Sequence, residues 1–279
     1  MISERVIQIA GEYKSWYEII NYMSYWLAFV FLAIWNIIKR KELDPEVNCV
    51  WIVAKAIGIL SAFFFAANWI NQISGDWFME GHKNYFGTMY TSIIMLIPAA
   101  LVFLSAPMKR LDYYTPCLAF ILAIFKVACH CAGCCYGKKW TYGIYSYVRC
   151  RFEYPIQLIE MGVALAIMVV LILYVTRWQK KRGTAAPLYI ILYCATRFIT
   201  EFMRADFGRY LRIFTAAQIH AVIGLVIGII LFVVLGKYGE RIDNFFEIKF
   251  APLRAKIFDK VPILLTNELR KGKQSTDTD

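Results

Sequence analysis

The chain has 279 residues, of which 59% are hydrophobic and only 18% are charged. Soluble domains carry roughly a quarter charged residues, and long apolar runs are typical of membrane spans, so the composition excludes an ordinary soluble domain. The net charge of +11 does not require a nucleic acid partner, because Lys and Arg gather beside the apolar runs, as membrane orientation and contact with anionic lipid require. We therefore expect an all-α integral membrane protein with no nucleic acid partner.

Seven apolar segments are long enough to be transmembrane helices and form an expected transmembrane domain over residues 21–236. Their expected bounds are about 21–38, 49–70, 87–107, 114–135, 155–176, 186–203 and 215–236. Residues 1–20 carry apolar positions at helical spacing, which predicts an amphipathic helix at the membrane interface. The tail at 237–279 mixes aromatic and basic residues and predicts one or two helices on the cytoplasmic leaflet, interrupted at Pro252 and Pro262, with a disordered end.

Basic residues at the ends of the spans predict the orientation. The loops after the first, third and fifth spans hold three, two and four basic residues at the span ends. The positive-inside bias puts these loops in the cytoplasm, the N-terminus outside and the C-terminus inside. The loop at 136–154, after the fourth span, then lies on the periplasmic or extracellular side although it is also basic. A phosphate-bearing ligand is one reason for that charge.

Charged side chains inside the spans need the bundle interior or a water-facing cavity. Lys126 lies in the fourth span and Glu160 in the fifth, while Arg197, Glu201 and Arg204 share one face of the sixth. This ladder is either a structural salt bridge or a support that holds one Arg toward a cavity, where its planar donor fork binds a lipid phosphate. Lys126 either reaches an interface or lines a polar cavity, and we favour the cavity.

Cysteines and glycines gather at the end of the fourth span, where residues 129–137 read Cys-His-Cys-Ala-Gly-Cys-Cys-Tyr-Gly. The spacing fits no recurrent zinc pattern, and neighbouring residues on a helix point about 100° apart, so five ligands would not converge. A redox dithiol is a further alternative, but buried free thiols are the default, and we expect no metal and no cofactor. Gly133 and Gly137 are expected to break the helix and to let backbone amides approach an anionic head group.

Four uncharged polar residues near span ends have ordinary explanations. Gln157 and Gln218 lie near the starts of the fifth and seventh spans, where hydrogen bonds between helices are the default. Tyr22 and Tyr90 lie near the outer ends of the first and third spans, where tyrosine is typical of the aromatic belt.

Four stretches, in chain order, resemble motifs of the prolipoprotein diacylglyceryl transferases, a family of seven-span enzymes of the bacterial inner membrane. Residues 129–137 resemble its glycine-rich signature, and 154–160 (Tyr-Pro-Ile-Gln-Leu-Ile-Glu) resemble its His-Pro-Ser-Gln-Leu-Tyr-Glu. Residues 197–204 resemble its Arg-Phe-x-x-Glu-Phe-x-Arg, and 215–219 resemble its Ser-Met-Gly-Gln-Ile. Tyr22 falls where the family has a functional tyrosine.

Several positions depart from the family pattern, so the chain resembles a divergent member. Lys126 stands where the signature has Arg. Residues 90–92 (Tyr-Thr-Ser) stand where the family has His-Gly-Gly or Tyr-Gly-Gly, and 61–63 (Ser-Ala-Phe) are the nearest match to its Gly-Gly-Arg. The tail beyond residue 236 has no counterpart.

The resemblance implies transfer of the diacylglyceryl group of phosphatidylglycerol to the lipobox cysteine of a preprotein, with release of glycerol phosphate. It implies catalytic roles for Arg197, Lys126, Tyr22 and Tyr90. It implies substrate binding, or support of it, for eight further residues: Cys129, Gly133, Gly137, Gln157, Glu160, Glu201, Arg204 and Gln218. The alternative, from another class, is a related membrane scaffold retasked to another lipid donor or acceptor, or to lipid binding without catalysis.

Overall fold

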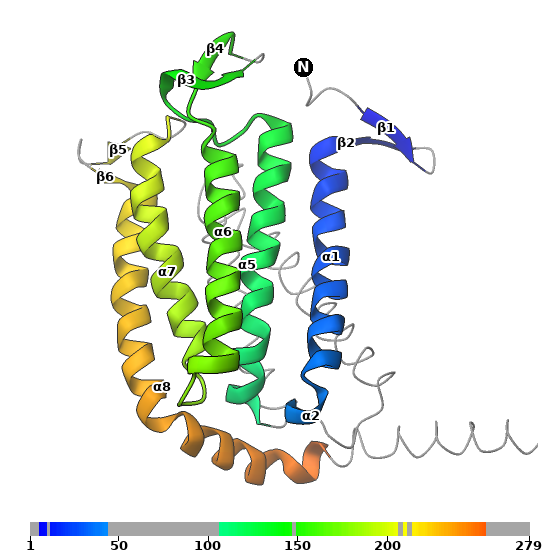
Figure 1. The fold of residues 1–279 in the computed structure, drawn as a ribbon, viewed down its shortest axis with the longest axis vertical. Helices are drawn as coiled ribbons and strands as arrows, with labels where there is room; N and C mark the ends of the chain where they lie inside the picture. Colours follow the sequence, from blue (N-terminus) through cyan, green and yellow to red (C-terminus); the bar gives the residue numbers. More distant parts are fainter. Residues whose placement is uncertain are drawn as a thin grey trace, which may run out of the picture.

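The structure, a computed structural model, describes residues 6–9, 12–43, 106–146, 149–205, 209–210 and 214–254. The long helices of these ranges stand side by side (Figure 1): α1 (Trp16–Ile38), α5 (Pro107–Ala132), α6 (Ile156–Leu173), α7 (Ala185–Thr200) and α8 (Ala216–Arg254). Three short helical elements extend them: α2 (Arg40–Leu43), the π-helical turn η1 (Tyr174–Trp178) and the 3₁₀ turn η2 (Glu201–Met203). The described strands pair as three antiparallel hairpins: β1 (Val6–Ile9) with β2 (Glu12–Ser15), β3 (Lys139–Ser146) with β4 (Arg151–Glu153), and β5 (Arg209–Tyr210) with β6 (Phe214–Thr215).

Three described helices are long and apolar enough to cross a membrane: Pro107–Ala132, Ile156–Trp178 and Ala216–Phe250. α1 adds the shorter apolar stretch Trp26–Ile38, and α7 has 16 residues. The chain is therefore a mostly helical, multi-pass membrane protein. The expectation of an all-α fold needs correction, because the described residues also form three β-hairpins. The expected second span, and the third except its last two residues, lie outside the described residues, so the total of seven stays a prediction.

The boundary between the expected third and fourth spans differs from the structure. α5 begins at Pro107, whereas we expected its span to begin near residue 114. Proline favours the first turn of a helix, where its missing N–H costs nothing, and this explains the early start. Lys109 and Arg110, expected between two spans, therefore lie in the first turn of α5.

The N-terminal prediction of one amphipathic helix over residues 1–20 is wrong for residues 6–9 and 12–15, which are strands, while 16–20 are helical. Val6 pairs with Ser15 and Ile9 with Glu12 in an antiparallel hairpin, and α1 begins only at Trp16. The β-branched residues of β1 favour a strand, and the two residues between β1 and β2 suit a tight hairpin connection. The helical spacing of apolar residues was a weaker signal than this local preference.

The end of α8 lies across one end of the bundle. α8 continues without interruption to Arg254, so the expected break at Pro252 is wrong, while Pro262 lies outside the described residues. Figure 1 shows the last part of α8 (orange) at the end that carries α2, opposite the end that carries β1–β2 and β3–β4. Asp243 fixes this arrangement, because its buried carboxylate accepts the backbone N–H of Met108 at 2.6 Å.

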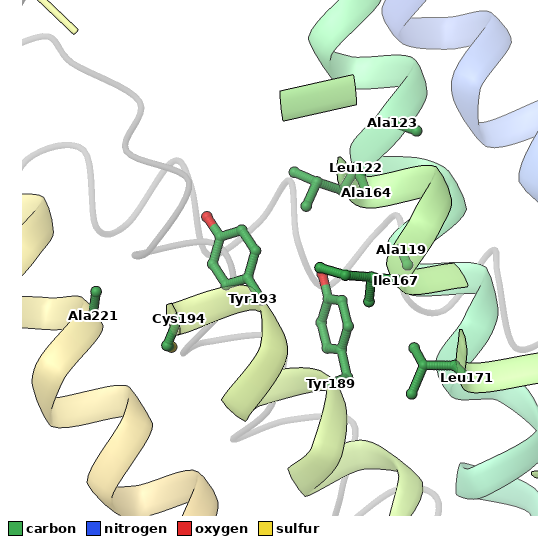
Figure 2. Close-up of a cluster of buried hydrophobic side chains, with 10 residues drawn as sticks. All are labelled: Ala119, Leu122, Ala123, Ala164, Ile167, Leu171, Tyr189, Tyr193, Cys194 and Ala221. Carbon is green, nitrogen blue, oxygen red and sulfur yellow. The ribbon is translucent and has the colours of Figure 1, made fainter. Parts of the chain in front are cut away.

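The largest described core joins α5, α6, α7 and α8. Figure 2 shows its members, among them Tyr189 of α7 and Ile167 of α6, with Ala221 contributed by α8. Glycine lets α7 and α8 approach closely: a Cβ added to Gly224 would lie 2.6 Å from the Cys194 sulfur, and one at Gly228 would lie 2.9 Å from the Ile191 side chain. This G-x-x-x-G spacing is a common contact motif of membrane helices.

Asp112 of α5 holds the start of α7, and its replacement is our first prediction. The buried carboxylate accepts the backbone N–H of Gly183 at 2.6 Å and of Ala185 at 2.8 Å. Asp112→Ala leaves these groups without an acceptor and is expected to lower the free energy of unfolding by about 2–3 kcal/mol. Asp112→Asn keeps one acceptor oxygen and should lose less. Denaturant unfolding in detergent micelles measures both; equal losses for the two variants would contradict the capping role.

Candidate functional site

Glu160 of α6 lies at the centre of a buried cluster of charges. Its Oε1 accepts a hydrogen bond from Arg197 Nη1 of α7 at 2.5 Å, and its Oε2 lies 2.6 Å from Lys126 Nζ of α5. Thr200 Oγ1 donates to the same Oε1 at 3.2 Å. The side chains of Lys126, Glu160 and Arg197 are all at most 13% exposed. One carboxylate thus joins three helices in the apolar interior.

The ladder predicted in the sixth span is present. Arg197 Nη2 lies 2.7 Å from Glu201 Oε2, and Arg204 Nε lies 3.6 Å from the same oxygen. The ladder crosses the end of α7, because η2 begins at Glu201 and Arg204 has an extended backbone. This turn brings Arg204 Nη1 within 3.7 Å of Glu160 Oε1, so both carboxylates are shared.

The cluster borders a small cavity between α5, α6 and α7. Its volume is about 20 Å³, enough for about one water molecule. Lys126, Glu160 and Arg197 line its polar side, and the rest is mainly apolar, with Ile167 and Tyr193 among the lining residues. Lys126 thus lines a cavity, but a small one whose lining is mainly apolar, and Arg197 lines the same cavity. Within the described residues this cluster has three cations and two carboxylates, and a further anion would offset the excess charge.

The segment after α5 turns back toward the cluster. Gly133, with φ at 68°, ends α5 in the left-handed conformation that glycine adopts readily, so its predicted role as helix breaker is confirmed. Side chains bind the carbonyls of this turn: Arg149 Nη1 donates to Gly133 O at 3.0 Å, and Gln157 Nε2 donates to Cys134 O at 2.7 Å. Gly137 then forms a bridge with Arg204, which attaches the turn to the end of α7.

Gly137 is required by a close approach within the protein. A Cβ at this position would lie 2.3 Å from the carbonyl oxygen of Tyr154. We expect Gly137→Ala to lower the free energy of unfolding by about 1–3 kcal/mol, because the backbone of Tyr154 must shift. Gly162→Ala is the matched control, since a Cβ there meets nothing within 4 Å and alanine favours a helix. Thermal unfolding in detergent compares the two; equal stability would contradict the close approach.

The basic loop at 136–154 contains the hairpin β3–β4. Arg149 Nε and Arg151 Nε each donate to Glu153 Oε1 at 2.7 Å. Burial alone would raise the pKa of Glu153, but these two guanidinium groups outweigh it and hold the pKa below its ordinary value of 4.5. The Arg149 guanidinium also lies 3.9 Å from the centre of the Tyr136 ring. The hairpin therefore holds several cations beside the turn.

Acid is expected to weaken this hairpin. A carboxyl whose folded-state pKa is depressed stabilises the fold fully above its unfolded-state pKa, near 4.5 for Glu153, and loses this contribution as the pH falls through the lower folded-state value. We expect the melting temperature of the wild-type protein to fall more between pH 5 and pH 3 than that of Glu153→Gln. Melting curves in detergent over this range measure the difference, and parallel profiles would contradict the role of the carboxylate.

The remaining predicted site residues lie in different places. Gln218 lies at the start of α8. Its side-chain Oε1 accepts the backbone N–H of Thr215 at 3.0 Å, and its backbone N–H donates to Thr215 Oγ1 at 3.2 Å. This is a capping box, so the described bonds of Gln218 are local, and the expected bond between helices stays a prediction. Cys129 lies in the last turn of α5 beside two other thiols. Tyr22 lies in α1 with its side chain outside the description, and Tyr90 lies outside the described residues.

Some contacts of the candidate site are not apparent from the sequence. The central position of Glu160 depends on the packing of α5, α6 and α7, which no local pattern reports. Arg149 was noted only as loop charge, although it binds the carbonyl of Gly133. The span position of Glu160, one turn into α6, was the available signal, because a buried carboxylate in a membrane needs a cation.

Comparison with known proteins finds the family whose motifs the sequence resembles. The family model described as prolipoprotein diacylglyceryl transferase matches residues 6–234. Phosphatidylglycerol–prolipoprotein diacylglyceryl transferase of Clostridium tetani is 29% identical over 133 residues, 45% of this chain and 53% of the relative. The enzyme of the same name numbered 2 in Clostridium perfringens is 27% identical over 132 residues, which cover 43% of this chain and 50% of the relative. The chain thus spans about half the length of these curated relatives. Since the family model matches more than half of the chain, the protein belongs to the prolipoprotein diacylglyceryl transferase family.

Proposed function

We propose that this protein transfers the diacylglyceryl group of phosphatidylglycerol to the thiol of a lipobox cysteine in a preprotein. The observation that carries the proposal is the buried cluster around Glu160. Lys126 and Arg197 line one cavity there, and the described residues of the cluster include three cations and two carboxylates. The names of the relatives, which are transferases with phosphatidylglycerol and prolipoprotein as substrates, support the same reaction.

The chemistry explains why cations are needed. The acceptor sulfur forms a bond to the terminal glyceryl carbon of the donor while the bond from that carbon to a phosphate oxygen breaks. The thiol loses its proton, and glycerol phosphate leaves as a phosphate monoester. The leaving phosphate gains negative charge as the bond breaks, so nearby cations stabilise the transition state more than the bound lipid.

We assign this work to the residues of the cluster and to two tyrosines outside it. Arg197, with a permanent charge and a planar donor fork, would be the main phosphate ligand. Lys126 would be a second cation without bidentate geometry. Glu160, Glu201 and Arg204 would hold Arg197 in place. Tyr22 and Tyr90 would orient the donor or polarise the thiol.

Further predicted residues would shape the head-group pocket. Gly133 and Gly137 set the turn after α5, and Gln157 binds the Cys134 carbonyl of that turn. Cys129 would contribute to the wall of the pocket. Gln218 would act at a distance, by fixing the start of α8 beside α7.

We also propose the location and orientation. The protein would lie in the bacterial inner membrane with β1–β2 and β3–β4 outside and with α2 and the last part of α8 on the cytoplasmic side. The charges at these ends and the grouping of elements in Figure 1 support this orientation. The last part of α8, with exposed Phe245 and Ile248 among basic residues, suits the surface of an anionic leaflet.

Turnover of phosphatidylglycerol tests the proposal against a retasked scaffold. The purified full-length protein is incubated with phosphatidylglycerol labelled in the head group and with a lipobox peptide. We expect release of labelled glycerol phosphate that depends on the peptide cysteine, and Lys126→Arg should keep or raise the rate because it restores a guanidinium. The absence of turnover by the intact, folded protein would exclude the enzyme and favour lipid binding without catalysis.

A further inference from the structure

Three thiols converge at the end of α5. The sulfur atoms of Cys129, Cys134 and Cys135 all lie within 4.8 Å of one another. On a continuous helix they would point in different directions, and this, together with the unusual spacing of the cysteines, is why the sequence predicts no metal here. Gly133 and Cys135 both have left-handed backbone conformations, with φ of 68° and 55°, and the chain turns back so that the last two cysteines meet Cys129.

The turn that carries the thiols is held from outside. As described above, Arg149 and Gln157 bind the carbonyls of Gly133 and Cys134. The backbone N–H of Ala205 donates to Tyr136 O at 3.1 Å, next to Cys135. A left-handed conformation is unfavourable for cysteine, so these contacts maintain a geometry that the local sequence does not prefer. The three thiols are therefore positioned before any ligand arrives.

Two cations lie near the thiols. Lys126 interacts electrostatically with all three, and Arg204 does so with Cys135. Thiolate is the form that binds metal ions. Three thiolates and one divalent ion together carry one net negative charge, which these two cations favour.

We propose that Cys129, Cys134 and Cys135 form a binding site for one thiophilic metal ion, with Zn²⁺ as the representative, and leave its fourth coordination position open. Zinc binds cysteine sulfur at about 2.3 Å, so three sulfur ligands of one ion lie about 3.8 Å apart. The observed limit of 4.8 Å requires only a small contraction of the turn. The bound ion would cross-link the end of α5 to the chain that leads into β3.

Metal retention tests the site. The full-length protein, purified in detergent with a reductant, is incubated with Zn²⁺, desalted and assayed by inductively coupled plasma mass spectrometry. We expect about one ion per chain for the wild type and loss of at least nine-tenths of it in Cys134→Ser and Cys135→Ser. Cys131→Ser and Cys150→Ser are matched controls, because neither residue belongs to the described cluster, and both should retain the ion.

A second measurement separates specific binding from misfolding of the variants. Zn²⁺ should raise the melting temperature of the wild type and of Cys131→Ser but not that of Cys134→Ser. The Cys134 side chain is exposed, so the Cys134→Ser variant should still fold. Absence of the ion from the wild type would overturn the proposal. Equal retention by a variant with all three cysteines replaced would do so as well, as would a disulfide between two of them in the freshly purified protein.

Discussion

Alanine in place of Arg197 is expected to lower the rate of diacylglyceryl transfer by about 10²–10³-fold. The guanidinium lies 2.5 Å from Glu160 and 2.7 Å from Glu201 and lines the cavity beside Lys126. Its removal takes away a fixed positive charge in a medium of low dielectric constant, where one donor to a developing anion is worth this much in rate. Initial rates at saturating lipid, measured with a lipobox peptide, give the comparison.

Two companion variants make this result interpretable. Arg197→Lys keeps the charge but loses the donor fork, and its rate should fall between those of the wild type and the alanine variant. Arg177→Ala removes an exposed arginine at the other end of the bundle and should leave the rate within about twofold. Gel filtration and melting curves establish that each variant is folded. A folded Arg197→Ala protein with the wild-type rate would refute the assigned role.

Methionine in place of Glu160 should lower the free energy of unfolding by about 3 kcal/mol or more. The substitution leaves Lys126 and Arg197 buried without their shared carboxylate, and removing one partner of a buried pair leaves an uncompensated charge. Glu240→Gln, an exposed position on α8, is the control and should stay within about 0.5 kcal/mol of the wild type. Denaturant unfolding in detergent measures both.

A double-mutant cycle shows whether Lys126 and Glu160 interact directly. Lys126→Met removes the cation that lies 2.6 Å from Glu160, so the double variant with Glu160→Met should recover at least about 1 kcal/mol relative to the sum of the single losses. Strict additivity of the two losses would show that the pair is not coupled and would contradict the central place of Glu160.

The elements that could be predicted are those with local causes. The apolar runs predicted α1, α5, α6, α7 and α8, because a span is specified by its own length and composition. The Arg197–Glu201 ion pair followed from spacing on one helix. The start of α5 at Pro107 and the hairpin of β1 and β2 also have local signals, proline at a helix start and β-branched residues around a short turn.

The rest depends on contacts between distant segments. Glu160 meets Lys126 only because α6 packs against α5, and Gly137 is required because Tyr154 passes close to it. Convergence of the thiols depends on the left-handed backbone of Cys135, a conformation that cysteine does not favour by itself. The sequence identified most of the charged residues of the site but not which carboxylate would join them.

Mass spectrometry of a lipobox peptide tests the proposed function most directly. The peptide is incubated with the purified full-length protein and phosphatidylglycerol of defined acyl chains, and its cysteine is then analysed. We expect a mass increase equal to one diacylglyceryl group on that cysteine, abolished when the cysteine is replaced by serine and strongly reduced with Arg197→Ala. An unmodified cysteine after incubation with the folded wild-type protein would contradict it.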